Sequence, residues 1–142
     1  MSNFNVMLKS DDIKLGESIA KSIRERNGGL LGVQAMAFPH DNNQTEIACN
    51  VDLVFVGNDP SKKIQLAIAQ GTLVHCMGQY YMTPFSNIYQ EIQRKANASG
   101  FSLSANSVVI GFTPQEACRI TEEALKMGNS WVVGHERNNK HM

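Results

Sequence analysis

Three residues that often take part in catalysis lie close together within residues 32–53 of the sequence. His40 and Asp41 are adjacent, and Cys49 follows eight positions later. A cysteine nucleophile, a histidine base and a carboxylate that orients the base would require these residue types. The stretch is therefore a candidate nucleophilic site, and the turn of a β-hairpin is the competing interpretation.

The residues around this stretch favour the hairpin. Two apolar runs, residues 33–38 and 45–56, enclose the sequence PHDNNQ, which is rich in residues that tolerate turn conformations. Every second residue of the later run is apolar, and Cys49 is one of them, so we expect its side chain on the core-facing side. His40 and Asp41 then lie in the turn, away from Cys49. We therefore assign no catalytic residue from the sequence.

A second pair with possible chemistry is His75 and Cys76, with Tyr80 and Tyr81 nearby. A reactive thiolate pair, at the centre of a small independent enzyme, is one interpretation of these residues. Neighbours on a strand project to opposite faces, however, and cannot easily hydrogen-bond to each other. This interpretation has the least support from the sequence.

Length and composition favour one domain and exclude several classes of partner. The 142 residues carry 13 basic and 13 acidic side chains with no basic block, so we expect neither nucleic acid nor a membrane surface as partner. No apolar run reaches the length of a membrane span, and the first residues lack a signal peptide's pattern, so a cytoplasmic protein is expected. The cysteines are three, widely spaced and outside any CxxC pair, which indicates neither a disulfide framework nor a metal site: Cys49, Cys76 and Cys118.

The first elements are a strand and a helix. The sequence FNVML, residues 4–8, alternates apolar and polar side chains as a half-buried strand does. Ser10 is expected to cap the following helix, which Gly28 and Gly29 should end. An apolar stripe at helical spacing faces the core: Leu15, Ile19, Ala20 and Ile23.

The second half of the chain predicts a helix, a strand and another helix. A helix is expected from Thr83 as its cap, with Pro84 in the first helical position, to Gly100. Residues 101–111 predict a strand, and Thr113 begins another helix. The expected core face of the first of these helices is Phe85, Ile88, Tyr89, Ile92 and Ala96.

The order of these elements predicts the fold class. Strand, helix, strand, strand, helix, strand is the plan of an α+β, ferredoxin-like (split βαβ) antiparallel sheet with helices on one face, here followed by a C-terminal helix. Residues 54–82 interrupt the plan, and they combine a helix start at Asp59 and Pro60 with strand-like alternation further on, so their structure stays open. We expect one domain over residues 1–134, with this insertion, and a polar tail over 135–142.

Three segments in this order resemble the C-terminal subdomain of glutamate formiminotransferase, the folate-dependent enzyme often fused to a cyclodeaminase. They are FNVML with the helix ESIAKSIRER, the hairpin VQAMAFPHDNNQTEIACNVDL, and TPFSNIYQEIQRKANASGFSLSANSVVIGFTPQEA. Two features depart from the family: the hairpin has Ala35, Ala37 and Pro39 in place of glycine or bulky polar residues, and residues 54–82 are inserted.

The resemblance implies a substrate class. In the family a formimino group passes between glutamate and tetrahydrofolate, which requires a base and donors that stabilise a tetrahedral centre. The family's general-base histidine and most of its ligand contacts belong to an N-terminal subdomain that these 142 residues do not resemble. If the chain is active, it is a transferase of formimino groups, and tetrahydrofolate or a derivative is the implied cofactor.

The polar face of the predicted sheet is the better candidate site. Amides and carboxylates suit the donor and acceptor edges of a pterin, and a plain solvated face is the competing interpretation. The expected ligand-binding residues are Gln34, Glu46, Asn50 and Asp52. We expect a homodimer or a separate subunit to dock on this face. The function expected is a formiminotransferase-related folate-binding protein, part of a split or partner-completed transferase; the alternative is a non-catalytic interaction or assembly module.

Overall fold

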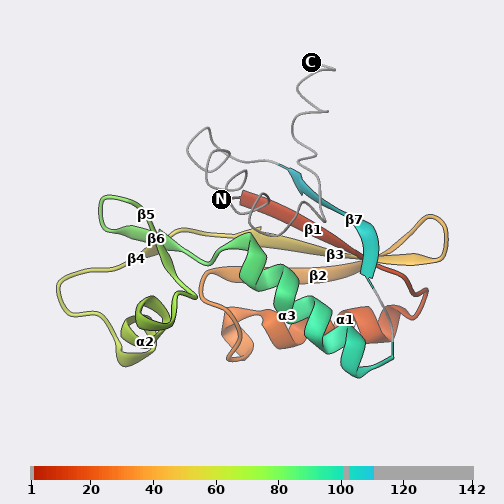
Figure 1. Cartoon of the computed structure of the whole chain (residues 1–142), viewed down its shortest axis with the longest axis horizontal. Coiled ribbons are helices and arrows are strands. Elements are labelled where there is room, and N and C mark those ends of the chain that lie inside the picture. The colour runs from red at the N-terminus through yellow and green to blue at the C-terminus, as the bar shows by residue number, and fades with distance from the viewer. Residues whose placement is uncertain (1, 101–102, 111–142) are drawn as a thin grey trace, which may run out of the picture.

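The computed structural model describes residues 2–100 and the backbone of residues 103–110. Its elements form two antiparallel sheets and the helices that accompany them (Figure 1). In chain order these are β1 (Ser2–Leu8), α1 (Ile13–Ile23), β2 (Val33–His40), β3 (Gln44–Val51), β4 (Val54–Phe55), α2 (Lys62–Gln70), β5 (Val74–Met77), β6 (Tyr80–Met82), α3 (Phe85–Ala98) and β7 (Leu103–Ile110).

The larger sheet has the strand order β2-β3-β1-β7, and every neighbouring pair is antiparallel. Strand β3 lies between β1 and β2, and β1 lies between β3 and β7, so each strand-helix-strand unit is split by a strand of the other. Both α1 and α3 lie on one face of this sheet (Figure 1). The predicted ferredoxin-like α+β fold is confirmed.

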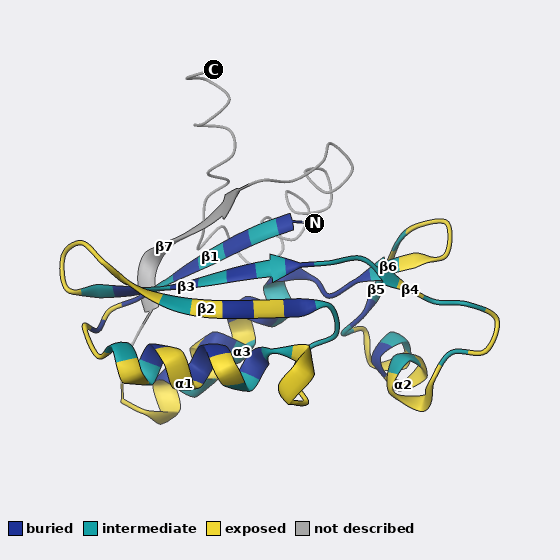
Figure 2. Cartoon of the chain, turned by 180° about the vertical axis from the view of Figure 1, so that it is seen from behind, coloured by how far each residue is buried: buried dark blue, intermediate teal, exposed yellow. Residues whose placement is uncertain are grey.

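The core lies between this sheet and the two helices. Burial alternates strictly along β1 and β3, which are the central strands, because successive side chains point to opposite faces (Figure 2). The rings of Phe4 and Phe85 stack at 4.8 Å between centroids and join the sheet to α3. The predicted core face of α3 is confirmed in full, and in α1 Ile19, Ala20 and Ile23 are buried while Leu15 is half-buried.

The ends of α1 differ from the prediction. The cap is Asp12, whose carboxylate accepts from the N–H of Leu15 at 3.1 Å, whereas Ser10 accepts from the N–H of Asp12 one turn earlier. The helix ends at Ile23 rather than at Gly28, because a short 3-10 turn over Glu25–Asn27 follows it. Gly28, at φ 82°, ends that turn instead.

The predicted cap of α3 is also wrong. Thr83 lies outside the helix and donates its hydroxyl to the carbonyl of Leu31 at 2.6 Å, and the N-cap is Pro84, which makes no side-chain cap. Because Thr83 is fully buried, this bond ties the start of α3 to the loop before β2. Thr83 therefore bonds to a distant carbonyl instead of to the first turn of α3.

The insertion forms a second sheet of order β4-β6-β5, with α2 beside it at one end of the main sheet (Figure 1). The strand expected to continue to residue 56 ends at Val51, and β4 pairs with β6 instead. Residues 59–70, whose sequence allowed either a helix or a strand, contain the helix α2, and Ser61 caps it by accepting from the N–H of Ile64. The C-terminal helix, the boundary at 134 and the tail lie outside the described residues.

Candidate functional site

The face of the main sheet opposite α1 and α3 carries polar and apolar side chains in rows across the strands. Register pairs Gln34 with Asn50 and Asn50 with Asn3, so three amides lie side by side across β2, β3 and β1. The next row in the same direction is Met36, Ala48 and Asn5, and the row after it is Phe38, Glu46 and Met7. We call this surface the open face.

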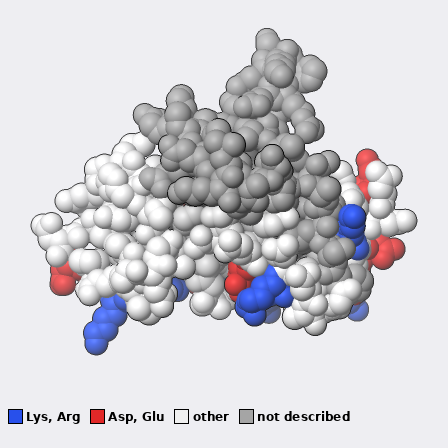
Figure 3. Space-filling view, viewed as in Figure 1, with Lys and Arg blue, Asp and Glu red and all other residues white. Residues whose placement is uncertain are grey.

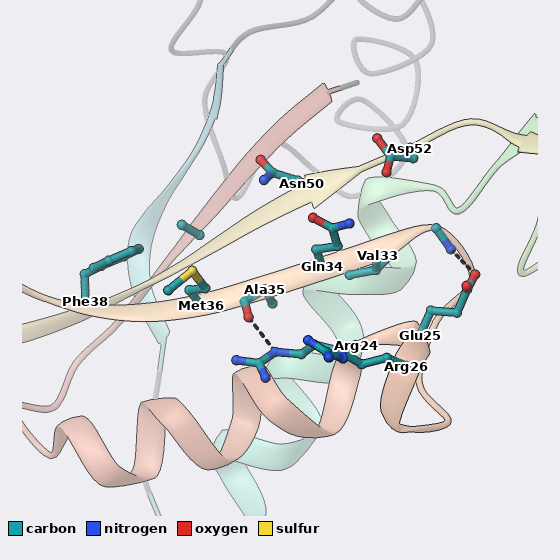
Figure 4. A pocket seen from close by; sticks show the side chains of 12 residues that line it. Arg24, Glu25, Arg26, Val33, Gln34, Ala35, Met36, Phe38, Asn50 and Asp52 are labelled. Atoms are coloured by element: carbon teal, nitrogen blue, oxygen red, sulfur yellow. Dashed lines mark hydrogen bonds between the residues drawn. The ribbon is translucent and has the colours of Figure 1, made fainter.

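A groove of about 740 Å³ runs along the β2 side of the open face. It brings together three of the four predicted ligand residues, Gln34, Asn50 and Asp52 (Figure 4). Glu46 shares the face but does not line the groove, although its cross-strand neighbour Phe38 does. The complete lining is Arg24, Glu25, Arg26, Gly32, Val33, Gln34, Ala35, Met36, Phe38, Ala48, Asn50 and Asp52.

The second border of the groove is the segment that follows α1. Arg24 donates from Nε to the carbonyl of Ala35 at 2.7 Å, which holds its guanidinium against the outer edge of β2 (Figure 4). Glu25 accepts from the N–H of Gly32 at 2.7 Å. Sequence reasoning missed Arg24, Glu25 and Arg26 because it assigned them to the helix. The signal available was the Gly28-Gly29 pair, which returns the chain to the sheet.

A glycine places Asp52 at the groove. Gly32 has φ 74°, and its carbonyl accepts from the N–H of Asp52 at 2.8 Å. A Cβ at position 32 would lie 2.5 Å from the Asp52 carbonyl oxygen, so this approach of the two backbones requires glycine. Asp52 follows the last residue of β3, and the contact fixes it beside the entry to β2.

Part of the groove wall is apolar. Met36 is 58% exposed and Phe38 is 44% exposed, although both are large hydrophobic residues of a regular strand. Ala48, between them and β1, adds a small apolar surface. A groove with amides at one end and thioether and aromatic surface at the other suits a flat heteroaromatic ligand, which needs both kinds of contact.

The residues that first suggested a nucleophilic site are separated in the fold. His40 ends β2 and Asp41 begins the turn, where Asn42 and Asn43 adopt φ of 63° and 57°, and both His40 and Asp41 are exposed. Cys49 is 1% exposed in the core, and burial raises the pKa of its thiol to about 12. The hairpin interpretation is confirmed, and this thiol is held neutral and inaccessible.

The pair in the insertion also fails to meet. His75 is exposed, its Nε2 lies 2.8 Å from the carbonyl of Gly78, and its ring packs edge-on to Tyr81. Cys76 is half-buried and packs against the main core. Adjacent strand residues therefore face opposite sides, as predicted, and no histidine-thiolate pair forms here.

The described residues offer neither a metal-binding cluster nor a membrane-spanning helix. Within this part of the chain, no group of three or more His, Cys, Asp or Glu side chains is arranged to hold a metal ion. None of its helices combines the length and apolar content that a membrane crossing requires. On the face that Figure 3 shows, the charged side chains of these residues are scattered and of both signs.

No family model matches the chain. A formiminotransferase cyclodeaminase-like protein of Arabidopsis thaliana is 37% identical over 89 residues, which are 61% of this chain and 29% of that protein. A glutamate formimidoyltransferase of Thermoplasma acidophilum is 25% identical over 115 residues, which are 80% of this chain and 29% of that protein. The resemblance to formiminotransferases seen in the sequence is thus confirmed as sequence similarity to these two proteins, and the chain spans 29% of the length of each.

Proposed function

We propose that this chain is a folate-binding protein of the cytoplasm that forms one part of a split or partner-completed formimino transferase. The single observation that carries the proposal is the groove in which Gln34, Asn50 and Asp52 meet, on the open face of a chain related to formiminotransferases. The resemblance implies that the open face corresponds to the sheet face of the C-terminal subdomain of glutamate formiminotransferase that packs toward the other subdomain.

The chemistry of the groove fits tetrahydrofolate or a derivative. A pterin presents alternating donors and acceptors along its edge, and the amides of Gln34 and Asn50 each offer both. Met36 supplies an apolar, polarisable surface for the ring. Arg24 and Arg26 at the border provide positive charge for the carboxylates of the folate tail.

The lining of the groove contains no histidine, which is the residue type that the resemblance implies as the general base; its carboxylates are Glu25, which accepts from the N–H of Gly32 at 2.7 Å, and Asp52. Formimino transfer requires removal of a proton from the attacking nitrogen. We therefore assign binding and orientation of the folate to this chain. A second surface, from another copy or a separate subunit, docks on the open face and supplies the base, the glutamate contacts and exclusion of water.

The second candidate function is an interaction or assembly module that retains the fold without turnover. The observation in its favour is a row of exposed large apolar side chains on the smaller sheet, away from the groove. The strand register places Phe55, Tyr80 and Met77 side by side across β4, β6 and β5. A binding module that serves assembly alone would show no affinity for folates.

Calorimetry with tetrahydrofolate and with folinic acid tests the proposal. We expect measurable heat and an upward thermal shift, and Asn50→Leu should weaken binding at least about tenfold through loss of its hydrogen bonds. Asn97→Leu is the matched control, because Asn97 is an exposed amide of α3 on the other side of the sheet. Absence of both heat and thermal shift refutes folate binding and leaves the assembly module.

A further inference from the structure

Strand β2 is the outer strand of the main sheet, and its outer edge carries backbone groups that the rest of the described chain does not pair in a strand ladder. The carbonyl of Ala35 points to this edge, because it accepts from Arg24 Nε. Hydrogen-bonding direction alternates along an antiparallel strand, so Ala37 and Pro39 face the same edge. Exposed strand edges of this kind pair readily with another chain.

The side chains next to this edge are the exposed apolar ones of the open face. Met36 and Phe38 are 58% and 44% exposed and lie two residues apart on the same side of β2. Proteins protect edge strands with charged side chains such as lysine or with proline, and β2 has one proline, Pro39, and no lysine, arginine or carboxylate. Apart from the carbonyl of Ala35, which Arg24 occupies, the described residues leave this edge and its apolar flank as one uncovered surface.

We propose that two copies of this chain pair through β2, antiparallel, about a two-fold axis at Ala37. Ala37 then bonds to Ala37 of the second copy, Ala35 pairs with Pro39, and the two four-stranded sheets join into one. A two-fold axis perpendicular to the sheet keeps both helix layers on one side. The two open faces lie together on the other.

Proline and arginine select this register. Pro39 has no N–H, so the carbonyl opposite it receives no ladder bond. With the axis at Ala37, that carbonyl is Ala35, which Arg24 Nε already satisfies at 2.7 Å. Moving the axis to residue 38 would place Pro39 opposite Ala37, whose carbonyl would lack a donor. Moving it to residue 36 would direct the N–H of Ala37 at the carbonyl that Arg24 occupies.

The same register matches the side chains and the charges. Met36 of each copy faces Phe38 of the other across a pair that is not hydrogen-bonded, where cross-strand side chains approach most closely. Asp41, exposed at the hairpin turn, comes opposite Val33 of the second copy, next to the border of the groove formed by Arg24 and Arg26. The register thus pairs apolar side chains at the centre and places Asp41 near a border that carries two arginines and Glu25.

We assign a second copy to this edge because Pro39 and the carbonyl of Ala35 lie at equal distances along the strand from Ala37 and match each other across a two-fold axis there. A peptide of unrelated sequence would not need this symmetric arrangement. The edge pairing goes beyond the proposed folate site and does not depend on it: it extends the open face and leaves the amide row of Gln34 and Asn50 uncovered. Loss of the dimer and loss of folate binding are separate measurements.

Sedimentation velocity and light scattering test the pairing on the full chain. We expect a species of twice the 15.7 kDa chain mass, and Phe38→Lys should raise the dimer dissociation constant at least about tenfold, because it removes two symmetric apolar pairs. Leu66→Lys is the matched control, since Leu66 is 57% exposed on α2, and should leave the constant within about twofold. A strict monomer, or equal effects of both variants, overturns the proposal.

Cysteine cross-linking tests the register. Met36→Cys and Phe38→Cys place thiols opposite each other only in a mixed dimer, at a Cα separation of about 4.5 Å, which a disulfide can span. We expect disulfide-linked dimers when the two variants are mixed and oxidised, and few when either is oxidised alone. Equal cross-linking in the single variants and the mixture, or none in the mixture of dimeric variants, contradicts the register.

Discussion

Gly16 sets how closely α1 can approach the hairpin, and replacing it tests the packing that positions the open face. A Cβ at residue 16 would lie 2.5 Å from Cγ2 of Thr45 and 3.3 Å from Cβ of Ala37. Thr45 cannot easily move, because it is 1% exposed and its hydroxyl donates to the carbonyl of Ser10 at 2.8 Å. Gly16→Ala must therefore push α1 away from β3.

The expected free energies follow from two opposing effects. Alanine favours a helix interior over glycine by about 1 kcal/mol, whereas overpacking at a rigid buried site costs about 3 kcal/mol. Gly16→Ala should thus lower the unfolding free energy by about 2 kcal/mol. Thr45→Ser removes the clashing methyl group, keeps the hydroxyl and costs about 1 kcal/mol. The double variant regains the helix propensity and should match the wild type, a coupling of about 3 kcal/mol.

Urea unfolding followed by circular dichroism measures this cycle, with the slope of the transition checked for two-state behaviour. The decisive result is the comparison of the double variant with Gly16→Ala, because rescue by a second destabilising change has no explanation in helix propensity. If Gly16→Ala stabilises the chain by its propensity alone, or if the two effects add, the close approach of α1 to Thr45 is wrong.

Three further predictions concern single interactions. Burial raises the pKa of the Cys49 thiol from 9.0 to about 12, so its contribution to stability is complete below pH 9 and is lost as the pH rises toward 12. Alkaline unfolding curves should show that loss, up to about 1.4 kcal/mol per pH unit, in the wild type and not in Cys49→Ala. Thr83→Val leaves the carbonyl of Leu31 without its donor and should cost about 1–3 kcal/mol in urea unfolding, whereas Thr83→Ser should cost less. Glu91→Gln removes an ion pair with Arg94 on the surface of α3, at 2.6 Å, and thermal unfolding should show a change below about 1 kcal/mol.

The parts of the fold that the sequence predicted are those with a strict period. Apolar side chains alternate with polar ones along β1 and β3 and recur at helical spacing in α3. Each pattern predicts which face of the element is buried in the core. The turn at Asp41 was also predictable, since asparagine at the next two positions tolerates the left-handed conformation that the chain adopts there.

The parts that it did not predict depend on tertiary partners. Thr83 has the sequence of a cap, but the carbonyl of Leu31, 52 residues earlier, binds its hydroxyl instead. Nothing local marks Arg24 as a neighbour of Ala35, 11 residues later, so half of the groove border was missed. Glu46 was grouped with Asn50 because alternation defines a face but gives no extent along it.

The alternation of β3 also makes the proposed site testable without loss of the fold. Cys49 and Asn50 are consecutive, yet one is sealed in the core and the other lines the groove. A substitution at Asn50 or Gln34 therefore changes the open face and leaves the contacts between the sheet and its helices intact. If such a variant loses both folate binding and stability, the open face is part of the structural support of the sheet; if it loses binding alone, the face is a ligand site.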